Sequence, residues 1–115
     1  MPVVGADTHE TLSGIATGDV SLIEQMLGLR EALAERSTLD GRTFALVKIA
    51  ALIALDAPPA SYAWQVTNAL SEGASAEDIL AVLTAVAPQV GGPRVVAAAP
   101  EIIVALGLAL PEGTE

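Results

Sequence analysis

The chain has 115 residues, of which 52% are hydrophobic and only 17% are charged, and its net charge is −9. This length fits a single domain over residues 1–115, and a domain of this size buries only about two thirds of its unfolded surface. We therefore expect part of the apolar surface to lie between copies of the chain. The negative charge opposes the phosphates of nucleic acid, so we expect no nucleic-acid partner.

Cysteine is absent from the sequence, and His9 is its single histidine. The chain therefore cannot form a disulfide, use a thiolate nucleophile or bind zinc through sulfur, and it has too few imidazoles for a typical transition-metal site. We expect no cofactor and no metal ion. His9 lies near Asp7 and Glu10, which is more typical of an exposed or helix-capping residue than of a proton donor at a subunit contact.

The sequence shows no membrane or export signal. Residues 1–4 lack a basic region followed by an apolar core, so no signal peptide is expected. The apolar run over 95–110 contains Pro100 and Glu101 and is too short to span a bilayer comfortably. These features predict a cytoplasmic protein with no membrane partner.

Helical periodicity runs through the chain and no strand pattern occurs, which predicts an all-α bundle of about six helices. The first helix is predicted over 7–16 and ends before Gly18. Ser21 and Glu24 have the spacing of a capping box and start a second helix that continues to about Arg36.

The third helix is predicted over about 42–55, with Thr38 or Asp40 as its cap. It is apolar on nearly all sides, and Lys48 is the only charged residue inside it, so we expect it at the centre of the fold. Two consecutive prolines end this helix, and the second, Pro59, suits the first turn of the next one.

The fourth helix is predicted over 59–72 and ends at Gly73, because glycine readily adopts the left-handed backbone of a helix end. Ser75 and Asp78 then have capping-box spacing and start a fifth helix that continues to about Val90. Because the connection is very short, we expect the fourth and fifth helices to form an antiparallel hairpin.

The sixth helix is predicted from about Pro93, with an interruption or restart at Pro100, and it fades by Gly107. Arg94 lies in its first turn. A guanidinium at this position can hold a carboxylate ligand in a bidentate fork, or it can form a salt bridge at the surface or between subunits.

Polar residues form one stripe along the fourth helix, where successive side chains are separated by about 100°. This stripe predicts either a pocket that binds a ligand through hydrogen bonds or a solvated helix face. The stripe comprises Ser61, Gln65, Asn68 and Glu72, while Ala63, Val66 and Leu70 are expected to face an apolar neighbour.

Tyr62 and Trp64 flank this stripe and are two of the three aromatic residues. They can wall an apolar pocket and donate a hydrogen bond, or they can anchor the core or an interface. Lys48 must reach solvent, form a pair or lose its proton, and a lysine of lowered pKa can act as a base or form a Schiff base. The alternative for Lys48 is an ion pair or interface contact. Arg42 is more typical of a pair with Asp40 or another carboxylate than of a substrate contact.

The order and spacing of several short segments resembles the carboxymuconolactone decarboxylase family over residues 39–99. This resemblance implies an all-helical fold of the alkylhydroperoxidase D type that assembles as trimers or hexamers. The segments are Leu39-Asp40-Gly41-Arg42-Thr43, Leu46-Val47, Ala50, Ala69-Leu70, Gly73, Glu77-Asp78-Ile79, Ala87-Pro88 and Gly91-Gly92-Pro93.

The resemblance also implies where the chemistry of relatives would lie. In the peroxidase branch a Cys-x-x-Cys-x-x-x-His motif precedes the glycine that here is Gly73. Counting back places Gln65 at the histidine position, Ser61 at the second cysteine and Pro58 at the first. The proton-relay glutamate of that branch, expected near residues 45–46, is also missing.

A serine hydroxyl cannot cycle between the redox states of a thiol, so thiol peroxidase activity is not expected. The decarboxylase branch commonly has a histidine at the Gln65 position, and an amide does not exchange protons near neutral pH as imidazole does. Two hypotheses remain. One is a lyase-like or isomerase-like enzyme that uses Lys48, Tyr62 and Gln65 on a small carboxylate or lactone. The other is a noncatalytic oligomer that binds a small molecule or serves in assembly. In either case the expected ligand contacts are Ser61, Trp64, Asn68 and Arg94.

Overall fold

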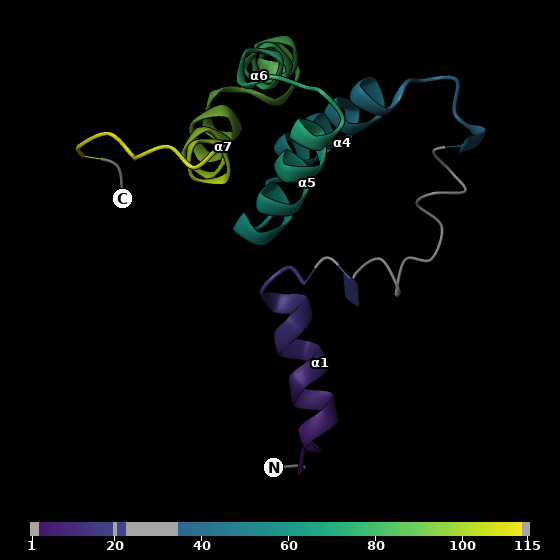
Figure 1. The fold of residues 1–115 in the computed structure, drawn as a ribbon. Helices are drawn as coiled ribbons and strands as arrows, with labels where there is room; N and C mark the ends of the chain where they lie inside the picture. Colours follow the sequence, from purple (N-terminus) through teal and green to yellow (C-terminus); the bar gives the residue numbers. More distant parts are fainter. Residues whose placement is uncertain (1–2, 20, 23–34, 114–115) are drawn as a thin grey trace.

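Five helices and no strand are found in the part of the chain that the computed structural model describes, residues 3–19, 21–22 and 35–113. The all-α prediction is confirmed. Helix α1 (Ala6–Ala16) buries none of its residues, and Figure 1 shows it set apart from the bundle formed by the later helices. Most of the predicted second helix falls on 23–34, outside the described residues.

Helix α4 (Gly41–Leu55) is the centre of the bundle, as its sequence predicts, because it has the most extensive contacts with the other bundle helices, mainly with α5 and α6 and also with α7. Its start is fixed by Asp40, whose carboxylate accepts a hydrogen bond from the Thr43 N–H at 2.7 Å. Ala45, Ile49 and Ile53 follow at intervals of four and are fully buried. Each isoleucine contributes about 1.5–3 kcal/mol through burial, so this stripe is a main source of stability.

Helix α5 (Pro59–Ser71) follows after a turn in which Asp56 adopts a left-handed backbone, with φ of 52°. Pro59 lies in its first turn, where the missing N–H costs no hydrogen bond. The chain leaves α5 through Gly73 at φ of +93°, a conformation that residues with a Cβ rarely adopt. Both ends of α5 therefore agree with the prediction.

Helix α6 (Ala76–Val90) begins with the predicted capping box, in which Ser75 and Asp78 satisfy each other's backbone N–H groups at 2.9 and 3.1 Å. Helix α7 (Gly92–Ala105) continues through Pro100, so the predicted interruption there is wrong. Ala98 and Ile102 are buried on either side of the proline. Their packing outweighs the backbone hydrogen bond that proline cannot donate.

The predicted hairpin of α5 and α6 is also wrong. Helix α6 packs mainly against α4 and also against α7, while α5 packs against α4 and α7. The short connection at Gly73 fixes where α6 starts, but its direction depends on where its apolar side can be buried. In Figure 1 α6 is seen nearly end-on at the top of the view, beside the α4 and α5 pair. The side of α6 that joins the core comprises Ile79, Val82, Leu83 and Val86.

Candidate functional site

The buried face of α5 differs from the predicted one. Gln65, in the middle of the polar stripe, is buried, while Ser61 and Asn68 on either side are half-buried and Glu72 is exposed. The solvated-face interpretation of Gln65 is therefore wrong for this chain. Ala63 and Leu70, expected to face an apolar neighbour, are exposed instead. The residues of α5 that enter the core are Tyr62, Gln65, Val66 and Ala69.

Gln65 is the one buried polar side chain among the described residues, with 9% of its surface exposed. Its carbonyl oxygen Oε1 is fully buried, and it accepts no hydrogen bond in that part of the chain. A buried acceptor without a partner costs about 1–3 kcal/mol. The Gln65 amide therefore lowers the stability of the fold at the face where α5 meets the core.

Tyr62 lies one turn before Gln65 on the same face of α5 and is 1% exposed. Burial raises the pKa of its phenol, and the negative charges of Asp56 and Glu101 raise it further. The hydroxyl therefore stays protonated at neutral pH, which suits a hydrogen-bonding group and not a base. The structure brings Tyr62 and Gln65 together at adjacent turns of one helix.

Arg94, at the start of α7, forms a salt bridge with Asp56, with 3.8 Å between the guanidinium NH1 and Oδ2. The salt-bridge interpretation of Arg94 is therefore the one that the structure shows. Both side chains are largely exposed, so the pair contributes little to stability. Asp56 was expected only in the run that ends the helix before it, and its pairing with Arg94 was not predicted.

Trp64 and Asn68 are half-buried on α5, next to Gln65 and one turn after it, respectively. Both take part in contacts within the protein. The Asn68 carbonyl also accepts a hydrogen bond from the Ser71 hydroxyl at 2.8 Å. Their positions flank the buried amide, and their role as ligand contacts stays a prediction.

Lys48 is half-buried on α4, and its ammonium lies 5.0 Å from the centre of the Phe44 ring, one turn earlier. This is the geometry of a cation–π interaction. The contact supports the interpretation in which Lys48 pairs within the fold. A catalytic role for Lys48 stays a prediction.

Arg42 binds Asp78, as predicted by the interpretation in which it pairs with a carboxylate. Its Nε donates to Asp78 Oδ2 at 3.1 Å, and its terminal nitrogen contacts the other oxygen. The hydrogen bond from Arg42, together with the Ser75 backbone N–H, lowers the pKa of Asp78 to about 2. This cluster links the start of α4 to the start of α6 and is structural in geometry.

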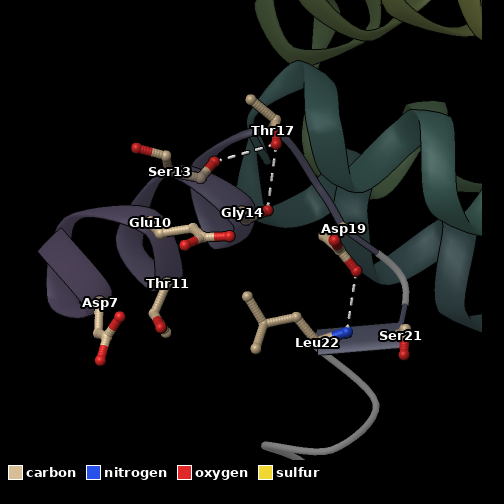
Figure 2. A pocket seen from close by; sticks show the side chains of 9 residues that line it. All are labelled: Asp7, Glu10, Thr11, Ser13, Gly14, Thr17, Asp19, Ser21 and Leu22. Carbon is tan, nitrogen blue, oxygen red and sulfur yellow. Dashed lines mark hydrogen bonds between the residues drawn. The ribbon is translucent and has the colours of Figure 1, made fainter.

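A separate open pocket lies between α1 and the residues that follow it (Figure 2). None of the predicted site residues lines it. Thr17 donates to the Ser13 and Gly14 carbonyls at 3.0 and 3.2 Å, and Asp19 accepts from the Leu22 N–H at 3.0 Å. Local backbone contacts thus account for these polar groups. The residues that line the pocket are Asp7, Glu10, Thr11, Ser13, Gly14, Thr17, Asp19, Ser21 and Leu22.

His9 is exposed on α1 and does not line this pocket. Within the described ranges, no group of three or more carboxylate or imidazole side chains is arranged to hold a metal ion. None of the helices in those ranges combines the length and apolar character needed to cross a membrane.

Comparison of the sequence with known proteins identifies the family of the chain. Searches among curated proteins and among solved structures give no match. The model of the carboxymuconolactone decarboxylase family matches residues 21–102, which is most of the chain and includes all of α4, α5 and α6. The all-helical bundle described above has the architecture of that family. The chain therefore belongs to the carboxymuconolactone decarboxylase family, as a member without cysteine.

Proposed function

We propose that this protein is a noncatalytic, non-redox member of its family that binds a small molecule at Gln65 on α5. The observation that carries this proposal is the buried Gln65 Oε1, which lacks a donor among the described residues. Buried polar groups in folded proteins nearly always have a hydrogen-bond partner. A ligand that supplies the missing donor gives this costly arrangement a physical reason.

The chemistry of the neighbouring groups supports binding over catalysis. Gln65 carries an amide, which neither gains nor loses a proton near neutral pH, and the raised pKa of Tyr62 keeps its phenol neutral. Both groups hold hydrogen bonds without transferring protons. The sequence contains no cysteine, so the thiol cycle of the peroxidase branch has no thiolate to start from.

A thermal-shift screen with small lactones, carboxylates, amides and alcohols tests this proposal. We expect a subset of compounds to raise the melting temperature of the wild type and to lose this effect in Gln65→Leu. The matched control is Thr67→Ala, an exposed position on the same helix, which should keep the response. The stabilising compounds are then incubated with the protein and followed by NMR. Conversion of a compound above the buffer rate would overturn the noncatalytic assignment and favour the lyase-like alternative.

We also propose that the chain associates with itself, as trimers or hexamers. Large apolar side chains remain exposed in the single chain, and on α7 Val96 and Val104 are 73% and 56% exposed on one side of the helix. Such surface is commonly covered by a partner. Light scattering at micromolar concentration should show a discrete oligomer, and a uniform monomer would contradict this expectation.

A further inference from the structure

The polarity of the orphaned atom restricts the chemical group that can pair with Gln65 Oε1. Oε1 is an acceptor, so its missing partner must carry an N–H or O–H group. A carboxylate has only acceptor oxygens at neutral pH and would direct lone pairs at lone pairs. A lactone likewise carries no donor.

The charges around this face of α5 also disfavour a carboxylate ligand. The carboxylates of Asp56 and Glu101 act on the Tyr62 hydroxyl, one turn from Gln65. Arg94, the cation expected to attract a carboxylate ligand, already contacts Asp56. The chain as a whole carries a net charge of −9. Bringing a further negative charge to this buried face is therefore unfavourable.

We propose that the ligand of this site is an uncharged small molecule that donates an N–H or O–H hydrogen bond to Gln65 Oε1, such as a lactam, a primary or secondary amide or an alcohol. This inference rests on the proposed binding function and specifies its ligand class. It differs from a small carboxylate or lactone, which the family resemblance favours. We expect such a molecule to approach from the side of Ser61 and Asn68, which are half-buried four residues before and three after Gln65.

Three probes of nearly equal size separate the possibilities. 2-Pyrrolidinone and γ-butyrolactone are five-membered rings that differ in one position, N–H in the lactam and oxygen in the lactone. Butyrate supplies the carboxylate. Each is titrated into the full chain, labelled with ¹⁵N, and the dissociation constant is obtained from amide chemical shifts. A hydrogen bond gained by the lactam and missed by the lactone should make the lactam bind about tenfold more tightly.

Variants at Gln65 and a control variant at Thr67 test whether Gln65 is the origin of that preference. In Gln65→Leu the lactam should bind no more tightly than the lactone, and Gln65→Met serves the same purpose if the leucine variant folds poorly. Thr67→Val, exposed on the same helix, should retain the wild-type ratio. Far-UV circular dichroism confirms that each variant is folded before titration.

The outcomes distinguish the two proposals. A lactam preference that disappears in Gln65→Leu supports both. Binding of the lactone or butyrate as tightly as the lactam, with dependence on Gln65, overturns the ligand class and leaves the binding site in place. Absence of any Gln65-dependent binding overturns the ligand class and the proposed function together.

Discussion

Two polar regions of this molecule are built in opposite ways. At the junction of α4 and α6, Arg42, Ser75 and Asp78 are joined by hydrogen bonds, and Asp40 caps the start of α4 through the Thr43 N–H. In the middle of α5, Gln65 is buried and its oxygen has no donor among the described residues. The polar groups at the junction have a structural role, because they hold the helix ends in place and so stabilise the fold. The amide of Gln65 has no such structural role among the described residues, which is why we propose that it binds a ligand.

The largest predicted effect is a loss of stability on truncating an apolar core residue that belongs to neither polar region. Replacing the fully buried Ile49 of α4 by alanine should lower the free energy of unfolding by about 2–5 kcal/mol, because it removes apolar contacts and leaves a cavity. Urea denaturation followed by circular dichroism measures this change. Val47→Ala, at an exposed position of the same helix, should change stability by less than about 0.5 kcal/mol. A small effect at Ile49 would contradict a core centred on α4.

Replacing Gln65 by leucine should have the opposite sign. The free energy of unfolding should rise by about 1–3 kcal/mol without ligand, because the variant no longer buries an unpaired acceptor. The same denaturation experiment measures it, with Thr67→Ala as the exposed control. A loss of stability in Gln65→Leu would show that the amide has an internal partner, and the contrast between the two regions would disappear.

A substitution at the junction of α4 and α6 should lower the stability of the protein. Ser75→Ala removes the side-chain cap of α6 and should lower the free energy of unfolding by about 1 kcal/mol. Ser71→Ala is the matched control, since its hydroxyl donates to the backbone carbonyl of Asn68 within α5 and caps no helix start. If both serine variants behave alike, the capping box contributes nothing beyond an ordinary surface hydroxyl.

The smallest predicted effect is a loss of stability at low pH that depends on Asp78. Asp78 has a folded-state pKa of about 2, below its ordinary value of 3.8, so its contribution is fully present above pH 4. It is lost as the pH falls from about 4 to about 2, where the carboxylate takes up a proton and releases Arg42. The thermal midpoint of the wild type should therefore fall more steeply over this range than that of Asp78→Asn. Equal slopes in the two proteins would mean that the pair is broken in solution.

Much of the fold could be predicted because its signals are local. Asp40, Pro59, Gly73 and Ser75 mark helix ends through their own backbone and side-chain chemistry, and each lies where expected. The predicted break at Pro100 failed because burial on both sides of the proline decides the outcome there. Local preference is a weak guide when tertiary packing opposes it.

The direction of α6 and the environment of α5 depend on contacts between distant residues. A short connection after Gly73 does not reveal that α6 packs on α4, and periodicity along α5 does not reveal that Gln65 is buried. Arg42 was expected to find a carboxylate, yet only the folded chain selects Asp78, 36 residues away. The sequence could thus name Gln65 as a candidate, but its buried and unpaired state required the structure.

The scarcity of aromatic residues gives the chain a built-in optical probe. Its sole indole belongs to Trp64, directly beside Gln65, and its sole phenol belongs to Tyr62 on the same helix. Light absorbed near 295 nm therefore excites one residue at one place. A change in the emission maximum or fluorescence lifetime of Trp64 therefore reports ligand binding or conformational change around the middle of α5. No attached dye is needed, and no other residue contributes to the signal.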